Sequence, residues 1–230
     1  KGIFGFGGTG SVSSLSNLVS NVGVVATDTS GVGTARQGIA AAGYGSDKAI
    51  FAYGNTGSNV ATSNLVSNSG VVASDVSGVG TARYGLGGAR YGDGLAIFAY
   101  GTLAGDPNLS ISNLVTNVGV VGTDVSGVGT TRYEPGAAGY GVGLAIFAYG
   151  YGSDVTAVSN KVSNVGVVAS DTSGVGTARH GVAAASYGGD KAIFGFGNVY
   201  PNKQGMTNLV SNTGVVAADV SAVGTVRFAP

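Results

Sequence analysis

Two series of oppositely charged residues recur along the chain at a nearly constant interval. The carboxylates are Asp28, Asp75, Asp124, Asp171 and Asp219, and the arginines, each eight residues further on, are Arg36, Arg83, Arg132, Arg179 and Arg227. One carboxylate without a second oxygen ligand nearby is a poor calcium site, whereas a carboxylate beside arginine forms strong, charge-assisted hydrogen bonds. We therefore expect structural roles: each aspartate caps the crossover turn or pairs with an arginine to fix a junction. The alternative, five equivalent anion or calcium sites, is less favoured, and we predict neither a metal site nor a cofactor.

Few residues could support catalysis. The chain has a single histidine, His180, and no cysteine, so a Ser-His-Asp triad or a multi-histidine metal site is hard to assemble. The recurring GVG lacks the Lys-Ser/Thr ending of a phosphate-binding loop. The small-residue segments, such as IAAAGYG at 39–45, contain no carboxylate pair of the kind that glycoside hydrolysis uses. We predict that the protein is not an enzyme.

Composition narrows the classes of partner. Eleven basic and eleven acidic side chains cancel, and charged residues make up 10% of the 230, far below the roughly 25% of an ordinary soluble domain. A broad basic surface for nucleic acid is therefore not expected. Since no stretch approaches the roughly 18 apolar residues of a membrane span, we do not expect membrane insertion. The surface must owe its polarity to Ser, Thr, Asn and Gly.

A hydrophobic motif accompanies the charged series and defines five repeats. The motif IF-(G/A)-(F/Y)-G begins at Ile3, Ile50, Ile97, Ile146 and Ile193. The repeats of about 47 residues fill the chain, so residues 1–230 are expected to form one domain. A period of 40 to 50 residues is typical of β-propeller blades.

Each repeat is predicted to contain four short strands. In the second repeat these are 39–45, rich in small residues, 49–54, apolar on both faces, and the hairpin 63–67 and 71–76 around an Asn-Ser-Gly turn. A strand that is apolar on both faces is sandwiched between neighbouring sheets, and small residues suit the crowded centre of a ring. The sequence therefore predicts an all-β, five-bladed β-propeller with four-stranded antiparallel blades, in preference to an open solenoid. The expected core is Ile3, Phe4, Ile50, Phe51, Ile97, Phe98, Ile146, Phe147, Ile193 and Phe194.

The order of these elements resembles the kelch repeat. Arginine, small-residue strand, IF-x-(F/Y)-G strand, loop and strand-turn-strand hairpin follow one another as in a kelch blade. The chain departs from that pattern in having no tryptophan, a glycine pair only at Gly7-Gly8, and fewer blades than is usual. Its length and period are also similar to those of five-bladed tachylectin-type lectins, whose Trp-containing motif is missing here. The sequence of its repeats resembles uncharacterised repetitive phage and environmental proteins.

The residue after each recurring arginine varies, and this position is our candidate binding surface. In kelch propellers, residues around this crossover border the channel mouth and contact partners, so the resemblance implies a mixed polar and aromatic ring. Aromatic side chains with hydrogen-bonding tips suit sugar or peptide ligands. The alternative is a solvent-facing plug without a ligand. The candidate residues are Gln37, Tyr84, Tyr133, His180 and Phe228.

Five repeats require five inner strands, yet the small-residue segment between an arginine and the next IF motif occurs four times. Either the first blade has three strands, or flanking sequence or a neighbouring chain supplies the strand, because unpaired edges invite strand addition. We expect a longer chain or a homo-oligomer. The favoured function is a non-enzymatic structural or adhesion module, for example in a virion or surface appendage, with an extracellular or virion-associated location. The alternative is a carbohydrate-binding lectin with repeated sites; the partner is then a glycan instead of a protein.

Overall fold

The computed structural model describes residues 1–8, 10–104 and 107–228, and within these ranges the protein is all-β. Each repeat forms one small antiparallel sheet, which we call units 1 to 5. Unit 1 consists of β1 (Gly2–Gly8) and β2 (Val12–Val19). Units 2 to 4 consist of β3 (Ala40–Tyr44), β4 (Lys48–Asn55) and β5 (Asn59–Val66); β6 (Gly87–Tyr91), β7 (Leu95–Ala99) and β8 (Ser112–Val115); and β9 (Gly136–Tyr140), β10 (Leu144–Ala148) and β11 (Ser159–Val162). Unit 5 consists of β12 (Ala183–Tyr187), β13 (Lys191–Gly195) and β16 (Thr207–Val210), with the added hairpin β14 (Asn198–Val199) and β15 (Asn202–Lys203).

The sheets of units 2 to 5 share one topology and one register. The strand with the IF motif lies in the middle of each sheet, between the small-residue strand and the first hairpin strand. In unit 2, Ala42 lies opposite Ile50, and Ile50 lies opposite Leu65. The corresponding pairs recur around Ile97, Ile146 and Ile193. Repetition in the sequence therefore corresponds to repetition in space.

The outer, fourth strand of the predicted blade forms only in part. In unit 2, the segment at 71–76 is joined to β5 through isolated bridges at Val72 and Val76. Between them the Asn64 side chain donates a hydrogen bond to the Ala73 carbonyl, 3.0 Å away. A side-chain bond thus takes the place of part of the backbone ladder, which corrects the expectation of four full strands to three strands and a bridged outer segment.

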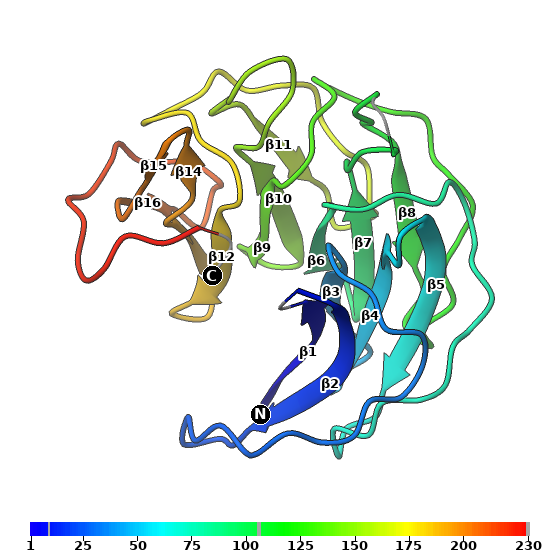
Figure 1. Ribbon diagram of the computed structural model, residues 1–230. Helices are drawn as coiled ribbons and strands as arrows, with labels where there is room; N and C mark the ends of the chain where they lie inside the picture. Colours follow the sequence, from blue (N-terminus) through cyan, green and yellow to red (C-terminus); the bar gives the residue numbers. More distant parts are fainter. Residues whose placement is uncertain (9, 105–106, 229–230) are drawn as a thin grey trace.

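The five units follow one another along an arc (Figure 1), and the small-residue strands lie on its inner side. β3 packs beside β6, β6 beside β9, and β9 beside β12. The approach is close, because a Cβ placed on Gly88 would come within 2.6 Å of the Ala41 carbonyl oxygen. A cavity of about 460 Å³, lined mainly by Ala and Gly of these strands, lies among them.

Backbone hydrogen bonds tie neighbouring units together at both ends of the inner strands. At the end near the crossovers the amide of one unit donates to the carbonyl of the one before it, and at the other end the direction is reversed. The first series is Gly85 to Gly38, Glu134 to Gly85 and Gly181 to Glu134; the second is Gly45 to Gly94, Gly92 to Gly143 and Gly141 to Asp190. The bonds are 2.7 to 3.1 Å long, so the inner strands are held as one continuous layer.

The core lies between units, as the double-sided apolar strands predict. Tyr53 of unit 2 meets Phe98 of unit 3 edge to face at 5.8 Å, and equivalent pairs join the later units. The expected core residues Ile50, Phe51, Ile97, Phe98, Ile146, Phe147 and Phe194 are buried, whereas Ile3 and Ile193 are half-buried.

The prediction for Phe4 is wrong, because no described unit packs on that face of unit 1. In units 2 to 5 the equivalent phenylalanine packs on the unit before it, while Phe4 is 64% exposed. At the other end of the arc, Tyr187 of β12 is 39% exposed, although Tyr44, Tyr91 and Tyr140 are buried. Within the described residues no sheet closes the arc between units 5 and 1 (Figure 1).

Candidate functional site

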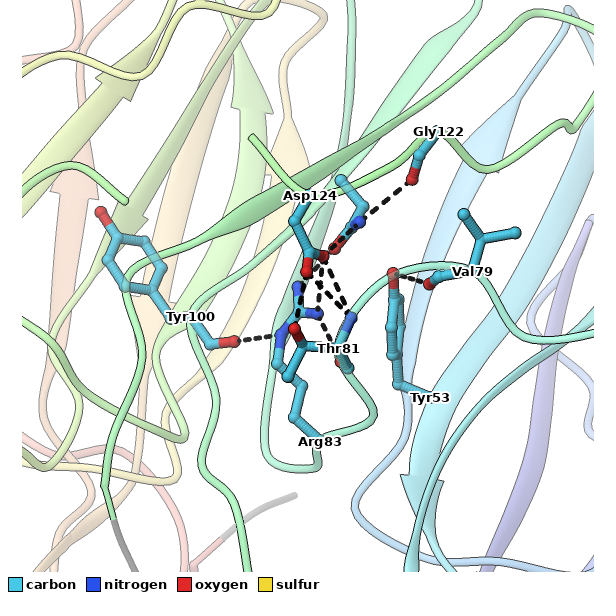
Figure 2. Close-up of polar contacts among 8 residues, drawn as sticks. Tyr53, Val79, Thr81, Arg83, Tyr100, Gly122 and Asp124 are labelled. Atoms are coloured by element: carbon cyan, nitrogen blue, oxygen red, sulfur yellow. Dashed lines mark hydrogen bonds and ion pairs between the residues drawn. The ribbon is translucent and has the colours of Figure 1, made fainter. Parts of the chain in front are cut away.

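The arginine that closes each GVGTAR segment lies at the junction between two units (Figure 2). Arg83 is completely buried. Its Nε donates to the Tyr100 carbonyl at 2.8 Å, Nη2 to Asn113 Oδ1 at 2.7 Å, and Nη1 to the Thr81 carbonyl at 3.0 Å. The guanidinium carbon lies 4.5 Å from the centre of the Tyr53 ring in the preceding unit, a cation–π contact. One side chain therefore contacts both units.

The aspartate of the next unit completes this junction. Asp124 accepts hydrogen bonds from the Thr81 amide (3.0 Å) and hydroxyl (2.6 Å) and from Asn113 Nδ2 (2.9 Å). Arg83 Nη1 lies 4.0 Å from the carboxylate. Burial acts to raise the pKa of Asp124, but the hydrogen bonds from Thr81 and Asn113, with the charge of Arg83, outweigh it and lower the pKa. The carboxylate is held in its charged form.

The same residue types meet at four junctions, and at each of them the aspartate belongs to the unit that follows. At the third junction, Arg132 donates to the Thr130 carbonyl and to Asn160, and its buried Nε has no hydrogen-bond partner among the described residues. Arg36 lies near Asp75 at 3.9 Å, and not near Asp28, which precedes it by eight residues. Burial lowers the pKa of Arg36, Arg83 and Arg132. The four sets are Arg36 with Asp75, Arg83 with Asp124, Arg132 with Asp171 and Arg179 with Asp219, the third of them bridged by Thr130 and Asn160.

Two further side chains of each junction were not among the residues selected from the sequence. The asparagines Asn64, Asn113, Asn160 and Asn208 are fully buried and connect arginine to aspartate. A tyrosine ring lies under Arg83, Arg132 and Arg179, whereas Phe6 lies under Arg36. The Tyr53 hydroxyl donates to the Val79 carbonyl at 3.1 Å (Figure 2), and burial raises the pKa of Tyr53 to about 12. The sequence signal for the asparagine is its strict recurrence in every repeat.

The charged residues at the two ends of the arc have different surroundings. Asp28 of unit 1 accepts a hydrogen bond from Asn17 Nδ2 at 2.8 Å, and in the described part of the chain no threonine or arginine bonds to it. Arg227 of unit 5 is exposed, stacks on Phe196 at 4.4 Å and donates to the Thr225 carbonyl at 3.2 Å. Each end therefore carries one half of a junction.

The candidate residues that follow the arginines lie at the entry to each inner strand. Four of them form an antiparallel bridge with the residue that follows the IF motif of their own unit. These pairs are Gln37 with Asn55, Tyr84 with Thr102, Tyr133 with Tyr151 and His180 with Asn198. Gln37 is exposed, Tyr84 is half-buried, and Phe228 is 38% exposed.

The structure brings three of the five candidates together and adds a fourth residue. Tyr133, Tyr151, His180 and Phe228 form an aromatic cluster with ring centres 5.7 Å apart for the tyrosine pair, 5.5 Å for Tyr151 and His180, and 5.2 Å for His180 and Phe228. Tyr151 lies in a loop whose sequence varies between repeats, so repetition gave no reason to select it. Gln37 and Tyr84 belong to earlier units and lie outside this cluster.

The cluster surrounds a polar contact between the only histidine and the only glutamate of the chain. His180 Nδ1 lies 2.8 Å from Glu134 Oε2, and Asn198 Nδ2 lies 3.4 Å from His180 Nε2. Glu134 has a φ of 53°, at the position where the other units have Gly38, Gly85 and Gly181. A side chain at such a φ costs about 1 to 2 kcal/mol, so the glutamate is retained against its backbone preference. Its replacement of a recurring glycine was the sequence signal that could have identified it.

The chemical groups of this surface could bind a small polar ligand. The rings present flat apolar edges beside carboxylate, imidazole and amide groups, the combination found in sites for small polar ligands. Among the residues that the structure describes, no group of three or more His, Cys, Asp or Glu side chains could hold a metal ion. In the same part of the chain no helix is long and apolar enough to cross a membrane.

No protein-family model matches the chain, and no curated protein matches it either. The resemblance to kelch and tachylectin-type propellers therefore stays a prediction.

Proposed function

We propose that the protein is a non-enzymatic structural or adhesion module, in which the five units are the blades of a β-propeller. The observation that carries this proposal is the complete burial of Arg36, Arg83, Arg132 and Arg179. The charged side chains of the four junctions are engaged in hydrogen bonds at the contacts between units, so they are not available to act on a substrate.

The junctions support a role that depends on shape. Buried ion pairs contribute little net stability compared with apolar packing, but they can specify one arrangement among several. Here the planar guanidinium donates in three fixed directions, to the Tyr100 carbonyl, Asn113 and the Thr81 carbonyl. Arg36 and Arg179 make the same three bonds, and Arg132 makes two of them. These four joints would fix the angle between successive units, as a scaffold requires.

The packing of the units supports the propeller. Successive sheets bury both faces of their middle strands, and the inner strands converge on a cavity lined by Ala and Gly. Both features are typical of blades arranged around an axis.

A second candidate function, carbohydrate binding, is favoured by the aromatic cluster. Tyr133 and Tyr151 offer ring faces and hydroxyl groups beside Glu134, and aromatic rings with nearby hydrogen-bonding groups suit sugars. The equivalent positions in earlier units hold Tyr84 with Thr102, and Gln37 with Asn55. A lectin of this design would bind most strongly at unit 4 and the start of unit 5.

A glycan array and a panel of chromogenic glycoside, ester and phosphate substrates separate these functions. For a structural module we expect no sugar binding and no hydrolysis. For a lectin we expect one sugar class to bind, with at least tenfold weaker binding for Tyr133→Ala and Tyr151→Ala, since truncating an aromatic hot spot costs about 2 kcal/mol. Asp190→Ala, in a turn at the opposite end of the inner strands, is the matched control. Hydrolysis of any substrate would contradict both proposals.

A further inference from the structure

Unit 1 has a strand edge that is covered in all the other units. In the described residues β1 pairs with β2 alone, whereas β4, β7, β10 and β13 each lie between two strands. The register identifies the equivalent positions, because Ile3 and Leu18 pair in unit 1 as Ile50 and Leu65 do in unit 2. By the pairing of β3 with β4, an additional strand would lie along residues 1–5. A free strand edge is a template for an extended peptide.

A cavity of about 980 Å³ lies between units 1 and 2, next to the turn end of this edge. Gly2 and Ile3 of β1, Leu18 and Val19 of β2, and Ala49 and Gly70 of unit 2 are among the residues that line it. The inner strand of unit 1 would end beside this space.

The other units show which side chain fits there. The tyrosine that ends each inner strand lies against a turn glycine of the next unit, and a Cβ on that glycine would meet the ring at 2.6 to 3.0 Å. These pairs are Tyr44 with Gly119, Tyr91 with Gly166 and Tyr140 with Gly214. At the equivalent Gly70, the three heavy atoms nearest to such a Cβ all belong to Leu18. The cavity therefore has the position and the glycine neighbour of a tyrosine site.

Unit 1 also presents the acceptor half of a junction. Where inner strands are present, the segment before them brings a threonine to the aspartate and an arginine to the asparagine of the same sheet. Asp28 and Asn17 occupy these positions in unit 1, and Asn17 Nδ2 already holds the Asp28 carboxylate at 2.8 Å. In the described ranges no donor bonds to Asn17 Oδ1. A negative charge and an amide oxygen suit an incoming arginine.

We propose that unit 1 binds a segment of the chemistry Thr-x-Arg, then a short strand of Ala and Gly, then Tyr. The arginine and threonine contact Asn17 and Asp28, the strand adds to the free edge of β1, and the tyrosine enters the cavity beside Gly70. This inference deepens the proposed structural role and rests on it, because it names the kind of partner that the module joins.

A second copy of the chain is a weaker candidate for the occupant. Its inner strands β3, β6, β9 and β12 are already paired within their own sheets. Its exposed Thr225 and Arg227 match the Thr-x-Arg part of the pattern, and within the described residues no strand follows them. A segment with the whole pattern, as in residues 34–44, would pair with the β1 edge, fill the cavity and donate to Asp28 and Asn17 at the same time.

The test uses the full chain and a synthetic peptide with the sequence of residues 33–45, GTARQGIAAAGYG. Isothermal titration, with peptide up to about 1 mM, should show saturable one-to-one binding. Hydrogen exchange should slow at least tenfold in β1 and stay unchanged in β10. Peptides with Arg replaced by Ala, Tyr replaced by Ala, or the central Ala replaced by Pro, which removes a backbone donor, should each bind at least tenfold more weakly.

Protein variants locate the site independently. Asp28→Asn should weaken peptide binding about tenfold, while Asp93→Asn, in an exposed turn of unit 3, should not change it; both residues are exposed, so both variants are expected to fold. Absence of binding, protection outside β1, or equal binding of the altered peptides would overturn the inference. A chain that self-associates through Asp28 and ignores the peptide would overturn it too, by making a second copy the occupant. Sugar binding or hydrolysis would count against the proposed structural role instead, whatever the peptide does.

Discussion

The junction between units 2 and 3 and the two ends of the arc are built from the same residue types but have different structures. At the junction, Arg83 is buried and donates to Tyr100 and Asn113. At the ends, Arg227 is exposed and Asn17 lacks an arginine partner among the described residues. Each repeat therefore carries half of the joint before it and half of the joint after it. A unit is complete only between two neighbours.

Because the repeats are nearly identical, several interior residues have a chemically matched counterpart at an end of the arc. The same substitution made at both places removes the same atoms. Any difference in the measured effect then reports the environment and not the residue type, and the predictions below use such pairs.

The largest difference is expected for arginine. Arg83→Ala leaves Asn113 Oδ1 and the Tyr100 carbonyl without their buried donor and removes the contact with the Tyr53 ring. We expect the free energy of unfolding to fall by about 3 to 5 kcal/mol. Arg227→Ala should change it by less than about 0.5 kcal/mol. Urea denaturation measures the loss of unfolding free energy for each variant. Equally large losses would show that Arg227 is also buried in a junction, and equally small losses would show that the arginine does not stabilise the junction.

Phenylalanine gives the second comparison. Phe98 is fully buried against Tyr53, whereas Phe4 is 64% exposed. Phe98→Ala should lower the free energy of unfolding by about 3 kcal/mol or more, and Phe4→Ala by less than about 1 kcal/mol. Thermal and chemical denaturation check this prediction. A large loss for Phe4→Ala would mean that another surface covers it in solution.

Two glycines of similar conformation distinguish the cost of backbone strain from the cost of a steric clash when each is replaced by alanine. Gly80 (φ 76°) and Gly224 (φ 80°) share a conformation, so alanine costs about 1 to 2 kcal/mol at either position. A Cβ on Gly80 would lie 2.3 Å from Asp124 Oδ1, but on Gly224 it would be 3.8 Å from Arg227 Nη2. Gly80→Ala should therefore destabilise the protein by at least about 1 kcal/mol more than Gly224→Ala. Similar values in urea denaturation would contradict the close approach.

The smallest expected effect is the change in the free energy of unfolding at low pH. Thr and Asn hydrogen bonds hold the pKa of Asp75, Asp124, Asp171 and Asp219 below the ordinary value of 3.8, although burial opposes this. A lowered pKa in the folded state means stability that is fully present above pH 3.8 and is lost as the pH falls through the folded-state values. We expect less than about 1 kcal/mol for each partly exposed carboxylate. When Asp124→Asn is denatured at a series of pH values, its free energy of unfolding should fall less steeply in acid than that of the unchanged protein. An equally steep fall would show that the Asp124 carboxylate does not contribute to the acid sensitivity.

The sequence was sufficient to predict the repeated architecture, because the IF motif and the charged series each recur five times. Residues buried in every interior unit, such as Ile97 and Phe147, could be chosen from their pattern alone. Phe4 could not, since burial there depends on a neighbouring unit and not on the local sequence. The four full strands predicted for each unit failed for a local reason: Asn64 bonds to the Ala73 carbonyl in place of the ladder.

The joint itself was only half predictable. Sequence proximity pointed to the arginine eight residues after each aspartate, but Asp75 meets Arg36 because adjacent sheets bring the previous crossover against it. Three members of the aromatic cluster, Tyr133, His180 and Phe228, were among the candidates selected from the sequence. Tyr151 and Glu134 could not be predicted from the repeats, because each stands at a position where the other repeats have a different residue.

A double-mutant cycle between Arg83 and Asn113 tests the central claim, that the recurring residues are joints between units. Arg83 Nη2 and Asn113 Oδ1 are 2.7 Å apart and buried, so the account predicts a coupling energy of about 1.5 to 3 kcal/mol. The equivalent cycle between Arg227 and Asn17 should be additive within about 0.5 kcal/mol. Additivity at Arg83 and Asn113, or strong coupling between Arg227 and Asn17, would contradict the account.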